Sequence, residues 1–473
     1  MRKRTNTFGV IVSNRNFFPD RLVEEGREQL LRAIEELGYK AVALSLEETP
    51  YGAVETRHDA ERCARLFADH KEAIDGVIVT LPDFGDEKAV ADTLRLSGLD
   101  VPVLVHAFPD EVGKLGIAHR RDAYCGKLSL CNNLVQYGIP FSNTTLHVES
   151  PGSDTFKEDL ETFAGVCNVV KGLRKARLGV VGARPSAFNT VRFSEKILER
   201  EGITVETVDL SEIIAQAQGL DSAASEVKRE LERIQDYIAT AGIPETALKK
   251  MAKLSLVLSG WIEKNALDAV AIQCWTAIEE IYGIVPCTVM SMLSENLIPS
   301  ACEADIMGAL SMYTLALAAQ APAALIDWNN NFSEDENKVI TFHCSNFPRS
   351  FFAGAEMSFQ AIIANEVGKE NTYGTCAGRI SPGPATFLRL SSDDLRGRIA
   401  SYLAEGEYTD DEVDTFGGYG VAEIRNLQGL MKTIVERGFE HHVAVVKGHV
   451  GAIVKEAIRK YLGWELYGHG SGS

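Results

Sequence analysis

The chain has 473 residues, of which 45% are hydrophobic and 24% charged, a composition typical of a globular protein with two or three apolar cores. Its net charge of -18 argues against nucleic acid as the main partner, because phosphate binding needs a basic surface. The sequence shows no signal peptide and no membrane-spanning stretch, and its nine cysteines form no CxxC pair, so we expect a cytoplasmic protein with reduced thiols.

The first part of the chain alternates strand-like and helix-like segments. The strand-like segments are TFGVIVSN, KAVALSL, DGVIVTL and VPVLVHAF. This spacing predicts a parallel sheet covered on both faces, in an α/β domain over residues 1–174. Asn14 and Arg15 lie at a strand's carboxyl end, where such sheets bind ligands. Next to Phe17 and Phe18, they suit sugar hydroxyls, and equally a loop packed under the two rings.

A second α/β domain is predicted over residues 175–345. It begins with RLGVVGARPSAF and continues through GITVETVDL and LDAVAIQCW, with helical stretches between them. VGARPSAF is neither a GxGxxG nor a Walker motif, so it predicts a strand-to-helix turn, from which Arg184 can reach a cleft. Trp275 follows a buried strand, where an aromatic ring either packs in the core or contacts a substrate.

Residues 346–473 are predicted to form a β-rich domain, because helical patterns become scarce while Gly, Ser, Thr and Pro increase. NTYGTCAGRISPGPATFLRL predicts two strands joined by a turn. HHVAVV predicts a strand headed by His441 and His442, which alternation would send to opposite faces, so that at most one is a ligand. The predicted fold class is therefore α/β, with two doubly wound parallel-sheet (Rossmann/flavodoxin-like) domains followed by a β-rich C-terminal domain.

The stretch from Ser300 to Pro348 concentrates the most chemistry. Glu303 ends a strand or opens a helix, Asp327 stands where an apolar run meets a polar loop, and His343 ends the β-branched run KVITF. Carboxylates with one or two histidines suit Mn²⁺, Co²⁺ or Mg²⁺, and the lack of a cysteine pair disfavours structural zinc. Each residue alone also suits a helix cap, a turn or a core histidine. Cys344 follows His343, and on a strand the two side chains should diverge.

Five motifs in this order resemble the L-fucose isomerase and L-arabinose isomerase family of aldose–ketose isomerases: SNRNFFP, CEADIMGAL, LIDWNN, TFHCSNFP and HHVAVV. The resemblance covers nearly the whole chain. It implies a divalent ion, usually manganese, and a homo-oligomer such as a hexamer with its active site near a subunit interface. It also implies Glu303 and Asp327 as metal ligands that move protons, and His442 as a further ligand. His343 matches a ligand of the arabinose-type branch, and the fucose-type branch does not use that position uniformly.

The expected function is a metal-dependent intramolecular oxidoreductase that interconverts an aldose and its ketose by enediol proton transfer. The candidate substrate-binding residues are Asn14, Arg15, Trp275, Trp328, Asn329 and His441. The alternative substrate is an anionic sugar such as sulfoquinovose, converted to sulfofructose, which would need two of four loop arginines to converge on its distal end. These arginines are Arg15, Arg184, Arg349 and Arg379. A non-catalytic sugar-binding protein is the alternative of another class.

Overall fold

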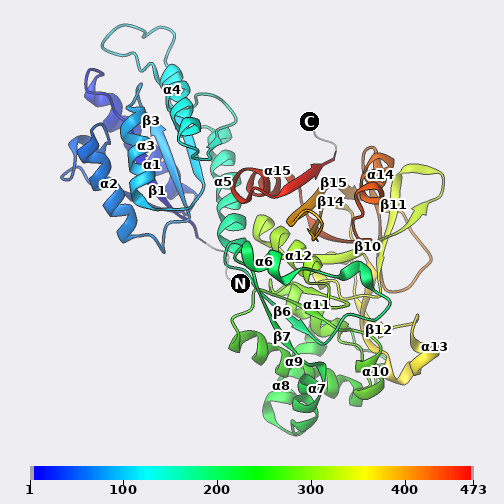
Figure 1. Cartoon of the computed structure of the whole chain (residues 1–473). Helices are drawn as coiled ribbons and strands as arrows, with labels where there is room; N and C mark the ends of the chain where they lie inside the picture. The colour runs from blue at the N-terminus through cyan, green and yellow to red at the C-terminus, as the bar shows by residue number, and fades with distance from the viewer. Residues whose placement is uncertain (1–4, 470–473) are drawn as a thin grey trace. The chain divides into compact units, whose positions relative to one another are not determined.

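The computed structural model describes residues 5–469, which divide into two compact units (Figure 1). The N-terminal unit comprises residues 5–171 and 456–463, and the main unit comprises residues 172–455 and 464–469. Two parallel sheets and one large mixed sheet confirm the predicted fold class. Among the described residues, no helix combines the length and apolar character needed to cross a bilayer.

The N-terminal unit is built on a five-stranded parallel sheet in the order β2-β1-β3-β4-β5, the flavodoxin-like order. Its strands are β1 (Thr7–Val12), β2 (Lys40–Ala43), β3 (Gly76–Leu81), β4 (Val103–Ala107) and β5 (Ser142–Asn143). Its helices are α1 (Asp20–Glu36), η1 (Pro50–Gly52), α2 (Arg57–Asp69), α3 (Glu87–Ser97), α4 (Ala123–Gln136), α5 (Asp154–Leu173) and the late π-helix η5 (Ala457–Leu462). Thr56 begins α2 with a capping box, since its side chain and that of Asp59 each bond the other's backbone N–H.

The main unit contains a second parallel sheet, of four strands in the order β7-β6-β8-β9. Its strands are β6 (Arg177–Val181), β7 (Thr204–Val208), β8 (Ala269–Ile272) and β9 (Ser300–Ala301). The helices between and after them are η2 (Asn189–Val191), α6 (Glu195–Arg200), α7 (Leu210–Gly219), α8 (Ser225–Tyr237), α9 (Glu245–Lys264), α10 (Ala277–Ile281) and α11 (Cys287–Glu295).

A mixed nine-stranded sheet completes the main unit. It comprises β10 (Ala323–Phe332), β11 (Asp335–His343), β12 (Glu356–Phe359), β13 (Tyr373–Arg379), β14 (Gly383–Asp393), β15 (Arg398–Tyr408), β16 (Gly418–Glu423), β17 (His442–Lys447) and β18 (Glu465–Gly468). The accompanying helices are η3 (Arg349–Phe351), α13 (Ala364–Val367), η4 (Lys369–Asn371), α14 (Leu427–Arg437) and α15 (Gly451–Glu456). Six strands, β16-β11-β10-β17-β14-β15, form a closed ring because β15 also pairs with β16.

The pairing corrects one local prediction for these strands and adds to another. The asparagines after Asp327 belong to β10, which forms a hairpin with β11, so the predicted polar loop is a strand. The strand propensity of asparagine is low, but the ladder with β11 supplies the backbone hydrogen bonds. The strands β13 and β14 exist as predicted, yet they pair with different neighbours and not with each other.

The helix α12 (Ile306–Ala319) is apolar on every side, and 13 of its residues, from Ile306 to Ala318, are buried. It contacts β6, β8 and β9 of the parallel sheet and β10, β14 and β17 of the mixed sheet, so it lies between the two (Figure 1). Asp305 caps its first turn by accepting a hydrogen bond from Gly308 N at 2.8 Å. This cap places the preceding turn, with Glu303, beside the ends of β10 and β17.

Candidate metal centre

Glu303 lies in the turn between β9 and α12. Both Glu303 and Ala304 have left-handed backbone conformations, with φ of 54° and 55°, a strained arrangement that proteins keep mainly at functional positions. The Glu303 carboxylate is buried, and its Oε1 accepts hydrogen bonds from Trp275 Nε1 at 3.0 Å and Cys274 Sγ at 3.4 Å. Its Oε2 is also buried but has no hydrogen-bond partner among the described residues.

The register of the mixed sheet brings Asp327 and two histidines together. Asp327 of β10 is the direct cross-strand partner of His442 in β17 on one side and of Phe342 in β11 on the other. His343, the residue after Phe342, is the last of β11. Three neighbouring strands therefore each present one of these side chains at the same end of the sheet.

The four side chains converge on one small region beside α12. His442 Nε2 lies 3.4 Å from Asp327 Oδ1 and 3.7 Å from Glu303 Oε2, and His343 Nε2 lies 3.7 Å from the same Glu303 oxygen. Asp327 Oδ1, like Glu303 Oε2, is a buried oxygen without a hydrogen-bond partner in the described part of the chain. Unpaired carboxylate oxygens facing imidazole nitrogens are a donor set that fits a divalent cation.

His441 also belongs to this region, which corrects the expectation that the two histidines point to opposite faces. The rings of His441 and His442 have centroids 4.5 Å apart, and His441 Nε2 lies 3.6 Å from Asp327 Oδ1. His441 precedes the first residue of β17, where strand alternation is not imposed. For the same reason Cys344, just after β11, does not diverge from His343, since its Sγ lies 3.6 Å from His343 Nδ1.

A buried network of charged side chains orients His442 through its Nδ1 atom. His442 Nδ1 lies 2.9 Å from Asp305 Oδ2, and Arg389 donates to the two oxygens of Asp305 at 2.6 and 3.1 Å. Arg389 is fully buried and also forms an ion pair with Glu440, Nε to Oε2, at 3.0 Å. Sequence reasoning did not single out these residues, although one signal was present: Arg389 is the single charge in the apolar run TFLRL.

The electrostatics of the centre favour ionised carboxylates. Burial acts to raise the pKa of Glu303, but His343, His442 and the Trp275 hydrogen bond outweigh it and lower the pKa to about 2. Burial likewise opposes protonation of His442, yet Asp305, Glu303 and Asp327 raise its pKa above the ordinary value. The Glu303 carboxylate therefore remains charged at neutral pH and attracts positive charge to this position.

Phe188 forms an aromatic wall beside the centre. Its ring centroid lies 5.4 Å from that of Trp275, 5.7 Å from that of His441 and 6.1 Å from that of His442. Phe188 comes from the VGARPSAF segment after β6. The sequence predicts only a strand-to-helix turn for this segment and carries no signal for its contact with His441 and His442, which lie far along the chain.

A cavity of about 930 Å³ borders the centre. Its lining includes Ala304, which follows Glu303, and Glu440, which precedes His441. Arg184 and Arg192 lie in the same lining, and within the described chain neither forms an ion pair with a carboxylate. The cavity therefore offers space for a small ligand next to the converging side chains.

The other predicted substrate-binding residues have separate surroundings. In the N-terminal unit, Asn14 donates to Glu55 at 3.1 Å and Arg15 pairs with Glu87 at 2.6 Å. Trp328 is not brought to the carboxylates, since its indole donates to Tyr402 at 2.9 Å and packs on Phe387. Asn329 is exposed on β10 and accepts from Asn330.

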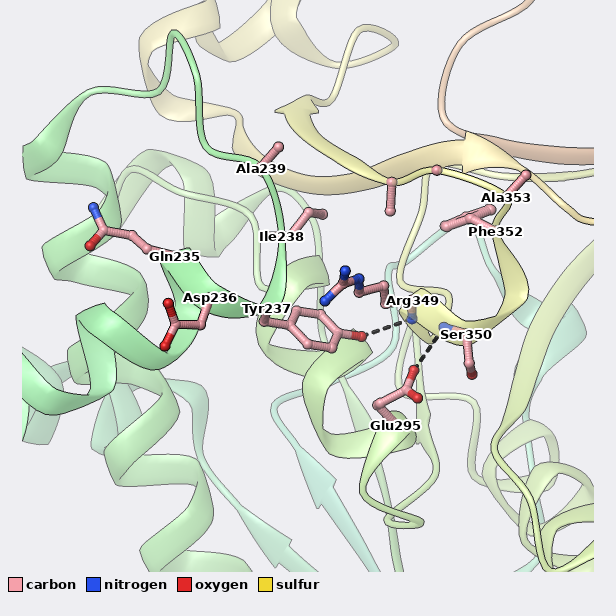
Figure 2. Close-up of a pocket in the computed structure, with 12 residues that line it drawn as sticks. Gln235, Asp236, Tyr237, Ile238, Ala239, Glu295, Arg349, Ser350, Phe352 and Ala353 are labelled. Carbon is pink, nitrogen blue, oxygen red and sulfur yellow. Dashed lines mark hydrogen bonds between the residues drawn. The ribbon is translucent and has the colours of Figure 1, made fainter.

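Arg349 and Arg379 do not line the cavity with Arg184. Figure 2 shows a different cavity, of about 650 Å³, where the Arg349 backbone N–H donates to Tyr237 at 2.8 Å and that of Ser350 to Glu295 at 2.9 Å. None of the predicted metal ligands lines it. Arg379 lines a third cavity and pairs with Glu412 at 3.7 Å. These arginines therefore do not converge.

Comparisons with known proteins give matches over most of the chain. A family model described as "Fucose/sulfoquinovose isomerase, N-terminal domain" matches residues 9–174, and one described as "L-fucose isomerase, C-terminal domain" matches residues 341–469. The sulfoquinovose isomerase of Priestia aryabhattai is 25% identical over 380 residues, which cover 80% of this chain and 82% of the relative. That of Alkalicoccus urumqiensis is 25% identical over 368 residues, 76% of this chain and 79% of the relative.

Proposed function

We propose that the reaction of this chain depends on a divalent metal held by Glu303, Asp327, His442 and His343. The premise is that the chain belongs to the L-fucose isomerase-like family of aldose–ketose isomerases. Two buried carboxylate oxygens, Glu303 Oε2 and Asp327 Oδ1, carry the proposal. Both face imidazole nitrogens, and neither has a hydrogen-bond partner among residues 5–469. Burying such an oxygen without a partner is unfavourable, and a cation would compensate for it.

The donor set favours Mn²⁺, with Co²⁺ or Mg²⁺ as alternatives, because carboxylate oxygens are mixed with imidazole nitrogens. When bound, the ion supplies Lewis-acid stabilisation of the negative charge that develops on the sugar oxygens. The chain's own part is to present the imidazole nitrogens in a fixed orientation. For His442, the bond to Asp305 does this by directing Nε2 towards Asp327 and Glu303.

Glu303 and Asp327 are the proposed proton-transfer groups. An aldose becomes a ketose when a base removes the proton from carbon 2, giving an enediol, and a proton is returned to carbon 1. The hydroxyl proton of the carbon 2 oxygen passes to the carbon 1 oxygen, so that carbon 2 becomes the carbonyl. A carboxylate can take the first proton and return it, so the step consumes no other reactant. Burial of Glu303 strengthens its interaction with the reacting atoms, because water is largely excluded there.

Arg184 and Arg192 favour an anionic sugar as the substrate. Both line the cavity beside the centre, and a guanidinium group suits a sulfonate oxygen better than it suits a hydroxyl. The relatives named sulfoquinovose isomerase support the same choice. The lining also contains Glu195 and Asp394, so neutral sugars of the L-fucose and L-arabinose type are the alternative substrates.

The decisive experiment is a panel of aldoses incubated with the full-length protein and Mn²⁺. L-fucose, L-arabinose, D-arabinose and sulfoquinovose are compared for ketose formation, with chelator-treated protein as the control. In deuterated water, proton transfer through an enediol introduces deuterium into the product, whereas a hydride shift retains all the substrate hydrogen. Absence of ketose from every sugar, with sugar binding retained, would support a binding protein and overturn the proposal.

The proposal further includes that the protein is a cytoplasmic homo-oligomer. None of the nine cysteines forms a disulfide in the described part of the chain, which supports a reducing compartment. Val112 and Ile117 are 91% and 88% exposed in the segment after β4, and apolar residues gathered in this way favour burial in an interface. Light scattering of the purified protein measures the assembly size, and a monomer at micromolar concentration would refute the oligomer.

A further inference from the structure

Four of the nine cysteines gather near Glu303. Cys274 follows β8, Cys287 begins α11, Cys302 follows β9 and Cys344 follows β11. The first three are at most 4% exposed. Four separate segments therefore deliver thiols to one buried region that the proposed reaction does not use.

The thiols form a continuous chain of contacts. Cys302 interacts with both Cys274 and Cys287, and Cys287 interacts with Cys344. At one end Cys274 Sγ donates to Glu303 Oε1 at 3.4 Å, and at the other Cys344 Sγ lies 3.6 Å from His343 Nδ1. Both ends of the chain thus touch residues of the candidate metal centre.

We propose that Cys274, Cys302 and Glu303 Oε1 form a second ion site, for a thiophilic divalent cation such as Zn²⁺ or Cd²⁺. The ligand atoms of these three residues lie within 4.8 Å of one another, close enough for small movements to bring them onto one ion. Cys287, in contact with Cys302, is available as a further thiol. On binding, each coordinating thiol releases its proton to solvent and forms a metal–sulfur bond, with no change of oxidation state.

The two carboxylate oxygens of Glu303 face chemically different groups. Oε1 faces sulfur and the Trp275 N–H, whereas Oε2 faces the imidazoles of His343 and His442. Sulfur ligands select soft ions, and oxygen with imidazole selects harder ones. A soft ion on the thiol side would hold the carboxylate that the proposed proton transfer needs, so its binding inhibits turnover. This inhibition rests on the proposed function, but the ion site itself does not.

The direct test uses Cd²⁺ as the probe and needs no activity. Cd²⁺ is titrated into full-length protein that has been reduced and freed of metal, and thiolate-to-metal charge-transfer absorption is followed in the ultraviolet. We expect a band that saturates at one ion per chain. It is lost in Cys302→Ala and in Cys274→Ala, two independent variants in case one does not fold. Cys376→Ala, at a buried thiol with other partners, keeps the band.

Absence of the charge-transfer band, or a band that survives in folded Cys302→Ala and Cys274→Ala, overturns the proposal. Mn²⁺ binding, followed by electron paramagnetic resonance, should be unchanged in Cys302→Ala, because this variant alters neither an imidazole nor the Cys274 and Trp275 hydrogen bonds to Glu303. Where ketose formation is established, Cys302→Ala should need at least about tenfold more Cd²⁺ for half-inhibition. If no aldose is converted, the proposed function fails while the band still reports on the thiol site.

Discussion

His442 Nδ1 lies 2.9 Å from Oδ2 of Asp305, and the same Asp305 oxygen accepts a hydrogen bond from buried Arg389 at 2.6 Å. A charged carboxylate on Nδ1 keeps the proton on that nitrogen and leaves Nε2 free to face Glu303 and Asp327. The geometry of the candidate centre therefore depends on residues that do not belong to it.

Asp305→Asn tests this dependence. We expect Mn²⁺ affinity to fall about 10- to 100-fold, the usual effect of removing a partner that orients a ligand. Loss of the charge beside Arg389 should also lower the free energy of unfolding by about 3–5 kcal/mol. Glu440→Gln is the matched control, since it removes the other charge on Arg389 without touching His442. It should lose stability but keep Mn²⁺ affinity, and equal affinity in both variants would contradict the orienting role.

Glu303→Gln tests proton transfer. The amide oxygen can still accept the Trp275 hydrogen bond, so the fold and its unfolding midpoint should change little. The value of kcat should fall about 10²- to 10⁴-fold, because an amide cannot accept the substrate proton. Steady-state kinetics with saturating Mn²⁺ measure the loss. Activity within a few-fold of the parent protein would remove Glu303 from the proton-transfer role.

Replacing Arg184 and Arg192 by methionine tests the charge of the substrate. If these arginines hold a sulfonate, the KM for sulfoquinovose should rise by about 10-fold or more, with little change for a neutral aldose. Arg349→Met is the control, because Arg349 lines the separate cavity of Figure 2. An equal rise for charged and neutral sugars would show that the arginines act on the fold of the cavity.

Phe188→Ala tests the aromatic wall. Contacts with Trp275 and the two histidines are worth about 0.5–1.5 kcal/mol beyond burial, so we expect a several-fold rise in KM for the sugar. Phe188→Leu keeps most of the apolar surface, so its KM should lie between those of the parent protein and Phe188→Ala. Phe416→Ala removes an exposed aromatic residue that packs on Phe342, and its kinetic constants should match those of the parent protein.

Glu279 predicts how stability depends on pH. Its carboxylate is fully buried, both oxygens lack hydrogen-bond partners among the described residues, and burial raises its pKa to about 8. The folded state thus holds a proton that the unfolded state, with a pKa of about 4.3, releases earlier. Stability from this group is therefore present at low pH and lost as pH rises from about 4.5 to about 8.

Glu279→Gln should remove this pH dependence. It should unfold like the parent protein near pH 4, below the unfolded-state pKa. Near pH 8.5 it should be more stable by a few kcal/mol, because each unit of pKa difference corresponds to about 1.4 kcal/mol. Chemical denaturation at the two pH values measures the difference. Exposed Glu280→Gln should have no such effect, and parallel stability profiles for all three proteins would show that Glu279 is ionised in the folded state.

Local patterns were sufficient for much of the fold. The strand-like runs before Asn14 and His343 are strands, and the period of α1 and α8 was visible because each has one apolar face. The convergence of Glu303 with His442 was expected from resemblance alone. Physical reasoning from the residues could not supply it, because it depends on a register between strands more than a hundred residues apart.

The contacts that could not be predicted are those that depend on the packing of distant segments. Strand alternation failed for His441 because it lies just before the ladder begins, a boundary that the sequence does not mark. The pairing of Arg389 with Asp305 joins a strand to a helix cap across 84 positions. The gathering of the thiols likewise depends on four separate segments. Each is a long-range contact, for which no single segment carries a signal.

The hairpin of β10 and β11 has a further consequence for how this protein can diverge. The spacing between Asp327, His343 and His442 is set by backbone ladders inside the closed ring, whereas the tip at Ser333 and Glu334 lies at the other end of the hairpin. Insertions at that tip leave the ladders unchanged. Descendants of one ancestral gene can therefore lengthen such outer segments, and acquire new surfaces, without disturbing the distances on which their chemistry depends.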